Sequence, residues 1–284
     1  MNRVDSGHRF ARREGMILLN VLLIMAVASV AVLVMVATQD IEVQRTTRIR
    51  EAAQANAYAR AGELSAITVL RRDGIEAPVS DNLAEPWANI DQDAISVPGG
   101  TFALTIRDDQ ARFNINQLKS GDPGPIALFQ AISEQAEIDP ASAIRLASVV
   151  RVAGPLTDFS LLYAAGIPPA DLARLEAYAV ALPSEASLNL NTADQAMLAI
   201  VLGDPSKAAD LIRRRGRPSG LTSTDLTDAG ISLPPGTGLT SNNFTVVTTV
   251  RVGDTTQRLS SRLTRRRSDR GVTVDVVGRK RTAG

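Results

Sequence analysis

The sequence predicts an α+β fold in which a long N-terminal helix carries an antiparallel sheet, and a large all-α subdomain is inserted between the strands. Three observations support this class. An uncharged apolar run begins at Met16, and no glycine or proline interrupts the chain from there to Ala61. Segments with the apolar and polar alternation of strands precede and follow a central region. That region is rich in alanine and leucine and is divided by proline and glycine, which predicts several short helices.

The composition argues against the commonest kinds of enzyme. The chain has 284 residues, no cysteine and a single histidine, His8, in its basic N-terminal segment. Serine-histidine triads and the usual zinc sites require an imidazole ring. The carboxylates and serines show no paired arrangement with the spacing of a catalytic site. We therefore predict that the protein is not an enzyme.

The N-terminus has the pattern of a membrane anchor. Residues 1–15 carry four arginines against two carboxylates, a balance of +2. Met16–Ala37 contains no charge and no proline, and its length suffices to cross a hydrocarbon core of about 30 Å. A secretory signal is the alternative, but its apolar region is usually about 7–15 residues long. We predict a transmembrane helix at 16–38, with the basic end in the cytoplasm and the rest exported.

The helix is expected to continue beyond the membrane as an amphipathic stem at 39–73. Small and apolar residues recur at three- and four-residue spacing from Ile49 to Ile67. This spacing gives the stem one face that can pack against a domain. Glu63 and Glu76 are assigned to its solvated face.

The sheet is expected to be built from residues 74–117 and 243–284. Thr101–Asp108 and Arg112–Asn116 alternate in polarity, with a turn-like Asp108-Asp109-Gln110 between them, which predicts a hairpin packed on the stem. The two aspartates are expected to be solvated. Further strands are predicted by the residue pattern at Phe244–Val252, Gln257–Thr264 and Val272–Val277.

Residues 118–242 are expected to form the inserted helical subdomain. Helices are predicted at Ile126–Ile138, Pro140–Val152, Phe159–Ala165, Pro169–Ala181, Thr192–Leu202 and Ser206–Arg215.

This part of the chain also contains an internal repeat. Ala111–Leu118 is similar to Ala186–Ala193, and Asp158–Pro168 is similar to Thr222–Ser232, which indicates two degenerate copies of one helical unit. Each copy contains paired asparagines, Asn114 with Asn116 and Asn189 with Asn191. We expect their short amides to bond nearby backbone, in preference to a ligand.

Charge is segregated along the chain. Residues 258–284 carry nine basic and two acidic residues, a balance of +7, whereas residues 16–257 carry 18 basic and 26 acidic residues, a balance of −8. The basic tail could contact an acidic neighbour, lipid or nucleic acid, but charge runs at chain ends are most often solvated.

The N-terminal segment resembles a known kind of export signal. Basic residues, Gly15, a hydrophobic start at Met16 and a span fused to an amphipathic stem are similar to the class III signal of type IV pilins and type II secretion pseudopilins. The resemblance implies that residues 1–15 are a leader peptide. It also implies that a prepilin peptidase cuts between Gly15 and Met16 and methylates the new N-terminus.

Further residues narrow the resemblance to K-type minor pseudopilins of type II secretion. Most such subunits have glutamate at the fifth mature position, which is Asn20 here, and loss of this glutamate is typical of the K-type. The sequences RFNIN at Arg112–Asn116 and LNLNTA at Leu188–Ala193 are moderately specific for the K-type. An amide at position 20 cannot neutralise a neighbouring subunit's amine, although it could simply form an interhelical hydrogen bond.

This resemblance covers most of the chain and carries several expectations. It implies a pilin-like sheet with a SAM-like helical insertion, in a single-pass protein of the bacterial inner membrane whose C-terminal domain is periplasmic. It implies partners: the I-type and J-type minor pseudopilins, the major pseudopilin and the prepilin peptidase. The function implied is to initiate and cap the pseudopilus at its tip and to support the export of folded proteins.

One departure from the family concerns calcium. Residues 149–162 read VVRVAGPLTDFSLL where the family commonly has a longer acidic segment, and Asp158 is the one carboxylate there. Calcium needs about six to eight oxygen ligands. We therefore expect no metal and no other cofactor. Asp91 and Asp93 are expected to be solvated.

The alternative function is that of a membrane-anchored helix-hairpin-helix protein for DNA binding and uptake. Such modules also begin with a segment similar to LNLNTA, and Arg213–Arg215 lies nearby. However, the turn that would face phosphate contains Asp204 and Pro205, a repelling carboxylate and a residue without an amide donor. The acidic body also lacks the charge of a nucleic-acid-binding protein, so no nucleic acid is expected.

Overall fold

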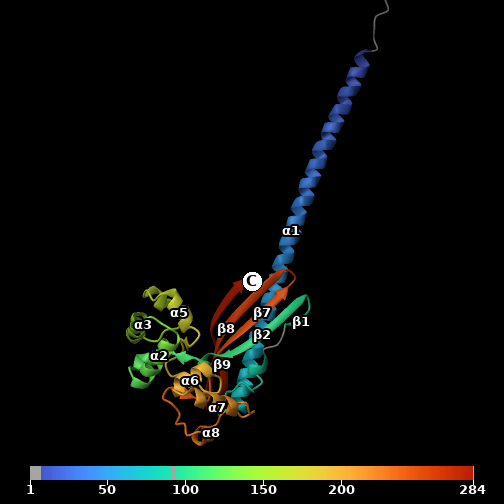
Figure 1. Ribbon diagram of the computed structural model, residues 1–284. Helices are drawn as coiled ribbons and strands as arrows, with labels where there is room; N and C mark the ends of the chain where they lie inside the picture. The colour runs from blue at the N-terminus through green and yellow to red at the C-terminus, as the bar shows by residue number, and fades with distance from the viewer. Residues whose placement is uncertain (1–7, 91–93, 284) are drawn as a thin grey trace, which may run out of the picture. The chain divides into compact units, whose positions relative to one another are not determined.

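The computed structural model describes residues 8–90 and 94–283, with side chains for 16–90 and 94–282. The chain forms two compact units, Met1–Gln54 and Ala55–Gly284. Within the first unit the described backbone is one helix. The second unit contains the rest of that helix, a five-stranded sheet and a group of short helices (Figure 1).

The N-terminal helix α1 extends over His8–Glu76. The helix predicted from Met16 to the end of the stem is thus confirmed, and it is longer at both ends. In the second unit one side of α1 packs against the sheet, where Ala66 and Leu70 are fully buried beside Leu104 and Phe244. A Cβ added at Gly62 would lie 2.8 Å from the Phe102 ring, so glycine permits the close approach of helix and strand.

The five-stranded sheet is antiparallel throughout, in the order β1-β2-β7-β8-β9 (Figure 1). The three strands predicted after residue 243 are confirmed. Their pattern of buried and half-exposed residues follows the alternation that predicted them. The strands are β1 (Ile95–Val97), β2 (Gly100–Asp108), β7 (Asn243–Val252), β8 (Thr255–Ser268) and β9 (Gly271–Ala283).

The hairpin expected between Thr101–Asp108 and Arg112–Asn116 is wrong. Strand β2 pairs with β1 and with β7, which lies more than a hundred residues further along the chain. The Asp108 side chain accepts a hydrogen bond from the Gln110 amide and begins the short 3-10 turn η2 (Asp109–Ala111). This turn leads the chain out of the sheet and into the helical insertion.

The helical insertion contains seven α-helices among the described residues, and they gather at one end of the sheet (Figure 1). The six helices predicted there are confirmed in place, with shifted ends. The first begins earlier because Pro123 opens its first turn, and the fourth is shorter because Ala179–Val180 forms strand β4. The helices are α2 (Pro123–Gln135), α3 (Pro140–Ala153), α4 (Ser160–Ala164), α5 (Pro169–Leu175), α6 (Gln195–Leu202), α7 (Pro205–Arg215) and α8 (Ser223–Asp228), of which α8 was not predicted.

Two small parallel strand pairs frame this insertion. The first joins β3 (Phe113–Asn114) to β4 (Ala179–Val180), and the second joins β5 (Leu188–Asn189) to β6 (Thr237–Gly238). The 3-10 turn η3 (Ile115–Ser120) follows β3, and another, η1 (Ala88–Ile90), precedes the sheet. Each pair begins and ends one half of the insertion. The helices share one apolar core that includes Leu146, Leu162 and Leu198.

Candidate functional site

The apolar part of α1 is the first candidate for a functional segment. It includes an 18-residue window with mean hydropathy 2.9 and with none of its residues buried within the structure. Large apolar side chains from Met16 to Val36 are 47 to 68 % exposed. The hydroxyls of Ser29 and Thr38 donate to carbonyls one turn earlier, each at 2.8 Å, which satisfies them inside the helix. Such a surface suits lipid or neighbouring helices, because exposing so many apolar side chains to water would be unfavourable.

The three residues predicted for processing and assembly lie on this helix. Met16 is 63 % exposed and Asn20 is also exposed. Gly15 lies within the helical backbone, but its surroundings are outside the described side chains, and residues 1–7 are outside the described part of the chain. The roles of Gly15, Met16 and Asn20 therefore stay predictions.

A buried ionic cluster joins the end of α1 to strand β8. Arg265 is only 1 % exposed; its guanidinium donates to Asp73 at 2.8 Å, to Asp81, and to the Ser241 carbonyl at 2.6 Å. It also lies 5.2 Å from the centre of the Phe244 ring. Removing the Arg265 guanidinium would leave buried carboxylates without a positive partner, which typically costs about 3–5 kcal/mol.

Three carboxylates lie together here, and two of them accept hydrogen bonds from Arg265. Asp73, Asp81 and Glu85 approach one another within 4.8 Å, and Arg267 lies 3.9 Å from Asp81. Burial raises the pKa of Asp73 to about 6 and the pKa of Glu85 to about 7. Because Arg265 donates directly to two of these carboxylates, the residues present do not fit a calcium site. Asp158, in the segment where the family has its acidic residues, accepts from the Ser160 amide at 2.8 Å, and Asp91 and Asp93 lie outside the described residues.

A second ion pair links the middle of α1 to strand β9. Arg279 donates to both oxygens of Glu63, at 2.7 and 2.8 Å, and the Ser261 hydroxyl donates to the same carboxylate. Hydrogen bonding from Arg279 lowers the pKa of Glu63. The expectation that Glu63 is solvated is wrong, since it is 2 % exposed. Glu76 is exposed as expected and pairs with Arg72 at 2.7 Å.

A third polar cluster fastens the insertion to the sheet. Asp108 accepts from Ser241 at 2.6 Å, from Asn189 at 3.1 Å and from Thr192. Burial raises the pKa of Asp108 to about 6 and also raises the pKa of Asp109, which accepts from Thr245 at 2.7 Å. The expectation that these two aspartates are solvated is wrong, because they lie at the junction of sheet and insertion and not at a surface turn.

The paired asparagines bond backbone groups, as predicted, but the second asparagine of each pair bonds backbone that is distant in sequence. The Asn116 amide donates to the Leu156 carbonyl at 2.8 Å and accepts from the Leu156 amide at 2.8 Å. Asn191 bonds the amide and carbonyl of Leu221 in the same way, at 2.6 and 3.2 Å. These asparagines are at most 1 % exposed. The matching contacts, one in each half, support the internal repeat.

The first asparagine of each pair also has the same role in both halves. Asn114 accepts from the Asn116 amide at 3.1 Å, and Asn189 accepts from the Asn191 amide at 2.9 Å. Their own amide groups donate to more distant parts of the chain, Asn114 to Pro183 and Asn189 to Asp81. All four asparagine side chains are thus engaged in internal hydrogen bonds.

Helices α6 and α7 form a helix hairpin, the arrangement that prompted the DNA-binding alternative. Asp204 begins α7, and its side chain accepts from the backbone amides of Ser206 at 2.8 Å and Lys207 at 3.3 Å. These amides are the donors that a phosphate would need. A carboxylate of the chain itself therefore takes the position of the anion.

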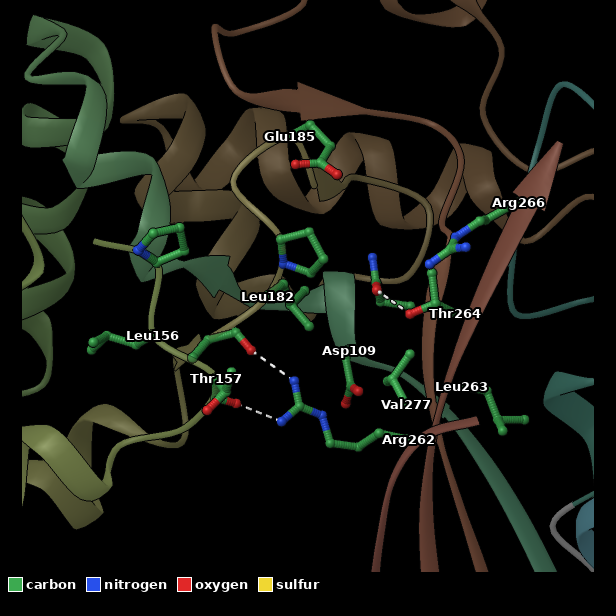
Figure 2. A pocket seen from close by; sticks show the side chains of 14 residues that line it. Asp109, Leu156, Thr157, Leu182, Glu185, Arg262, Leu263, Thr264, Arg266 and Val277 are labelled. Carbon is green, nitrogen blue, oxygen red and sulfur yellow. Dashed lines mark hydrogen bonds between the residues drawn. The ribbon is translucent and has the colours of Figure 1, made fainter. Parts of the chain in front are cut away.

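A cavity of about 310 Å³ lies where the insertion meets the sheet (Figure 2). Leu156 and Leu182 of the insertion form an apolar wall, and Val277, Arg262 and Arg266 come from the sheet. Arg262 donates to the carbonyls of Thr157 and Ala181, which joins the two walls. The described lining contains no nucleophile paired with a base.

The sequence did not lead us to predict the buried ion pairs, although the residue pattern of β8 indicated one buried charge. On β8 the residues Leu259, Ser261, Leu263 and Arg265 are spaced by two and share the face that packs on α1. A charged residue in such a series implies a buried partner. The identity of the partner, which lies about 190 residues earlier, has no local signal.

Comparisons with known proteins identify relatives of this chain. No model of a known protein family matches it. Type II secretion system protein K of Pseudomonas aeruginosa is 27 % identical over 297 residues, which cover 89 % of each chain. The protein of the same name from Aeromonas hydrophila is 29 % identical and covers 88 % of this chain and 92 % of the relative. That of Klebsiella pneumoniae is 32 % identical over 147 residues, about half of this chain and 45 % of its own.

The fold also matches a solved structure. A chain in the crystal structure of the GspK-GspI-GspJ complex from the enterotoxigenic Escherichia coli type 2 secretion system superposes with a TM-score of 0.66 at 18 % identity, covering 84 % of this chain and 99 % of that one. At this identity the match supports the α+β fold. Together with the two relatives that match along nearly the whole chain, it agrees with the family that the sequence motifs indicated. The chain is similar along nearly its whole length to type II secretion system protein K.

Proposed function

We propose that this protein is a minor pseudopilin that assembles with other minor pseudopilins at the tip of the type II secretion pseudopilus, initiates and caps it, and supports the export of folded proteins from the periplasm. The observation that carries this proposal is one long helix, apolar and exposed at its start, that continues into a sheet with a bulky helical insertion. The apolar part can pack among neighbouring helices or lipid. The insertion adds bulk beyond the sheet, which suits the end of a filament better than its shaft.

The proposed maturation and location follow from the N-terminal segment. A prepilin peptidase removes residues 1–15 and methylates Met16, and the remaining helix holds the protein in the inner membrane with its domain in the periplasm. Gly15→Val should block cleavage, because the peptidase needs a small residue before the cut. A longer precursor, seen by mass spectrometry of the membrane fraction, is expected for this variant. Normal processing of Gly15→Val would refute the leader assignment.

The proposed partners are the I-type and J-type minor pseudopilins, with the major pseudopilin below them. Support comes from the structural relative, which was solved as a complex of GspK with GspI and GspJ. Asn20 stands where most subunits have glutamate, so this subunit offers no carboxylate to the amine of a subunit next to it. This difference favours a position at the end of the filament. The protein acts by assembly and not by catalysis.

The assembly proposal is tested by isolating the complex. The full chain, carrying an affinity tag at its C-terminus, is co-expressed with the I-type and J-type pseudopilins of the same system and purified in detergent. A complex that contains all three proteins is expected by light scattering. Isolation of the chain alone, together with salt-sensitive binding of labelled duplex DNA, would instead favour the DNA-uptake function.

A further inference from the structure

The two faces of the sheet differ in how their positive charges are satisfied. The inner face, which packs on α1, presents Arg265 and Arg279, and each has a carboxylate of α1 within 2.8 Å. The outer face presents a set of cations that we call the basic face. The strand register places these residues together: Arg107 of β2, Arg251 of β7, Arg258, Arg262 and Arg266 of β8, and Lys280 of β9.

The cations of the basic face have little internal compensation. Arg107, Arg251, Arg258, Arg266 and Lys280 are exposed. Within the described part of the chain, one carboxylate lies within 4 Å of these five cations. It belongs to Asp275 and is 3.7 Å from Arg266. Most of the remaining positions on this face are threonines and other uncharged residues. The same strands thus pair their inner charges and leave their outer charges available.

A β-bulge connects the basic face to the cavity of Figure 2. Gly278 lies opposite Arg262 and Val276 lies opposite Leu263, so Val277 has no partner on β8. Bulges of this kind re-aim a side chain. Val277 is 55 % exposed and faces the cavity beside Arg266, with Leu156 and Leu182 across from it (Figure 2).

The adjacent strand edge is available for backbone pairing. Strand β9 is 13 residues long and is the last strand of the sheet, and within the described residues it pairs with β8 alone. An exposed edge of this length can accept an added strand, whose backbone hydrogen bonds supply affinity while side-chain pockets supply specificity. The cavity beside Val277 is large enough for one apolar side chain.

Resting on the proposed function, we propose that the basic face and the outer edge of β9 form the docking surface for an extended acidic segment of a partner pseudopilin. Carboxylates of that segment pair with Arg258 and Lys280, and one apolar side chain enters the cavity beside Val277. Charge complementarity favours an acidic partner, because among the described residues the five exposed cations of this face have one carboxylate within 4 Å, that of Asp275. A protein segment fits better than nucleic acid, because an open strand edge and a cavity with an apolar wall, lined also by Asp109 and Glu185, offer nothing specific to a sugar-phosphate chain.

Charge reversal on the outer face of β8 and β9, with a control on the inner face, tests this proposal. The full chain is purified in detergent, and its binding to the co-expressed I-type and J-type pseudopilins is measured at several salt concentrations. The double variant Arg258→Glu with Lys280→Glu should weaken binding at least about tenfold and flatten the salt dependence. Arg281→Glu is the matched control, because Arg281 is exposed on the same strand but shares the inner face with Arg279.

A second pair of variants tests the cavity. Val277→Trp should fill it and weaken binding by about tenfold, since the anchor side chain can no longer enter. Arg281→Trp adds the same bulk on the same strand but on the inner face and outside the cavity lining, and it should bind within about twofold of the unaltered chain. Circular dichroism and melting temperature are recorded for each variant, so that loss of folding is separated from loss of binding.

The outcomes separate this inference from the proposed function. If the unaltered chain binds the pseudopilins and the reversal of Arg258 and Lys280 has no more effect than Arg281→Glu, the docking surface is wrong while the assembly function stands. If the unaltered chain binds neither pseudopilin, both are wrong. If the same two cations instead mediate binding of duplex DNA or of anionic phospholipid vesicles, with no pseudopilin bound, the proposed surface is also overturned.

Discussion

At the scale of single residues, the buried amides determine how the insertion holds together. Asn116 makes hydrogen bonds to both backbone groups of Leu156 and to the Leu182 carbonyl. No water can replace these bonds, since the side chain is 1 % exposed. The paired-asparagine pattern predicted that the amides bond backbone groups, because short amides in extended segments commonly do so, but it did not identify partners 40 and 66 residues away.

Removing the Asn116 side chain should destabilise the folded protein. We expect Asn116→Ala to lower the free energy of unfolding by about 2–4 kcal/mol, because it leaves buried backbone groups unpaired. Urea denaturation followed by circular dichroism measures the change. Asn242→Ala is the control, since Asn242 is exposed, and it should stay within about 0.5 kcal/mol of the unaltered chain. Equal effects of the two variants would contradict this role of Asn116.

The carboxylates around Arg265 should make stability depend on pH. The pKa of Asp73 is raised from 3.8 to about 6 and that of Glu85 from 4.5 to about 7, mainly by burial. The folded protein therefore binds these protons more tightly than the unfolded chain. Their contribution to stability is present at low pH and is lost as the pH rises through about 4 to 7.

A neutral substitute for Asp73 tests this dependence. The asparagine of Asp73→Asn keeps an oxygen that can accept from Arg265. Its amide carries no charge and has nearly the shape of the protonated carboxyl group. We expect this variant to match the unaltered chain at pH 5 and to exceed its stability by about 1–2 kcal/mol at pH 8. Melting curves at both pH values measure the difference. Lower stability of Asp73→Asn at pH 8 would contradict the raised pKa.

At the scale of elements, the apolar part of α1 carries the strongest sequence signal. Placing two arginines in its middle, Val27→Arg with Val30→Arg, adds a cost of about 2.5–3.5 kcal/mol for each charge in a membrane centre. We expect the double variant to leave the membrane fraction on carbonate extraction. The matched variant Val27→Leu with Val30→Leu should stay in it. Retention of the arginine variant in the membrane would argue against a spanning helix.

Other elements show why part of the fold could not be predicted. The alternation of β2 predicted which of its residues are buried. It could not predict the partner strand, because Arg107 pairs with Thr245, which is more than a hundred residues away in the sequence. The expected hairpin failed because a pattern of alternation does not specify the partner strand. Helix α8 was missed because it has six residues and one buried apolar side chain, Leu226, which gives almost no periodicity.

In the candidate site too, the features that depend on neighbouring residues could be predicted, and those that join distant residues could not. The span and the bonds within each asparagine pair depend on residues close together in sequence, and they were predicted. The bonds of Asn116 to Leu156 and of Asn191 to Leu221 reach 40 and 30 residues along the chain, and no local pattern indicated these partners. The ion pairs of Glu63 with Arg279 and of Asp73 with Arg265 join residues about 200 positions apart. These pairs appear only when α1 is laid against the sheet. The polarity of β8, with Arg265 in an apolar series, gave a hint of burial but no partner.

At the scale of the whole molecule, the arrangement of carboxylates bears on whether calcium binds. In the cluster of Asp73, Asp81 and Glu85, the two aspartates accept from a guanidinium, and Asp158 accepts from a backbone amide in a segment with no other carboxylate. The chain therefore has no oxygen set suited to calcium among its described residues. We expect chelation by EDTA to leave the melting temperature of the full chain in detergent unchanged, and added calcium to raise it by less than about 1 °C. A large rise on adding calcium would contradict this account.

The charge distribution also belongs to the whole molecule. The basic tail is largely a β-hairpin, with β8 and β9 presenting some cations inward to carboxylates and others outward. The expectation that the tail is simply solvated is therefore wrong for Arg265 and Arg279. The outward cations supply the surface that we propose for a partner.

Secretion in the source organism tests the central claim most directly. The gene for this chain is deleted, and the extracellular amount of a protein that leaves the cell by type II secretion is measured alongside the rate of DNA uptake. The account predicts that secretion falls to background and is restored by the unaltered gene, with DNA uptake unchanged. Secretion that persists in the deletion strain, with DNA uptake lost, would contradict it.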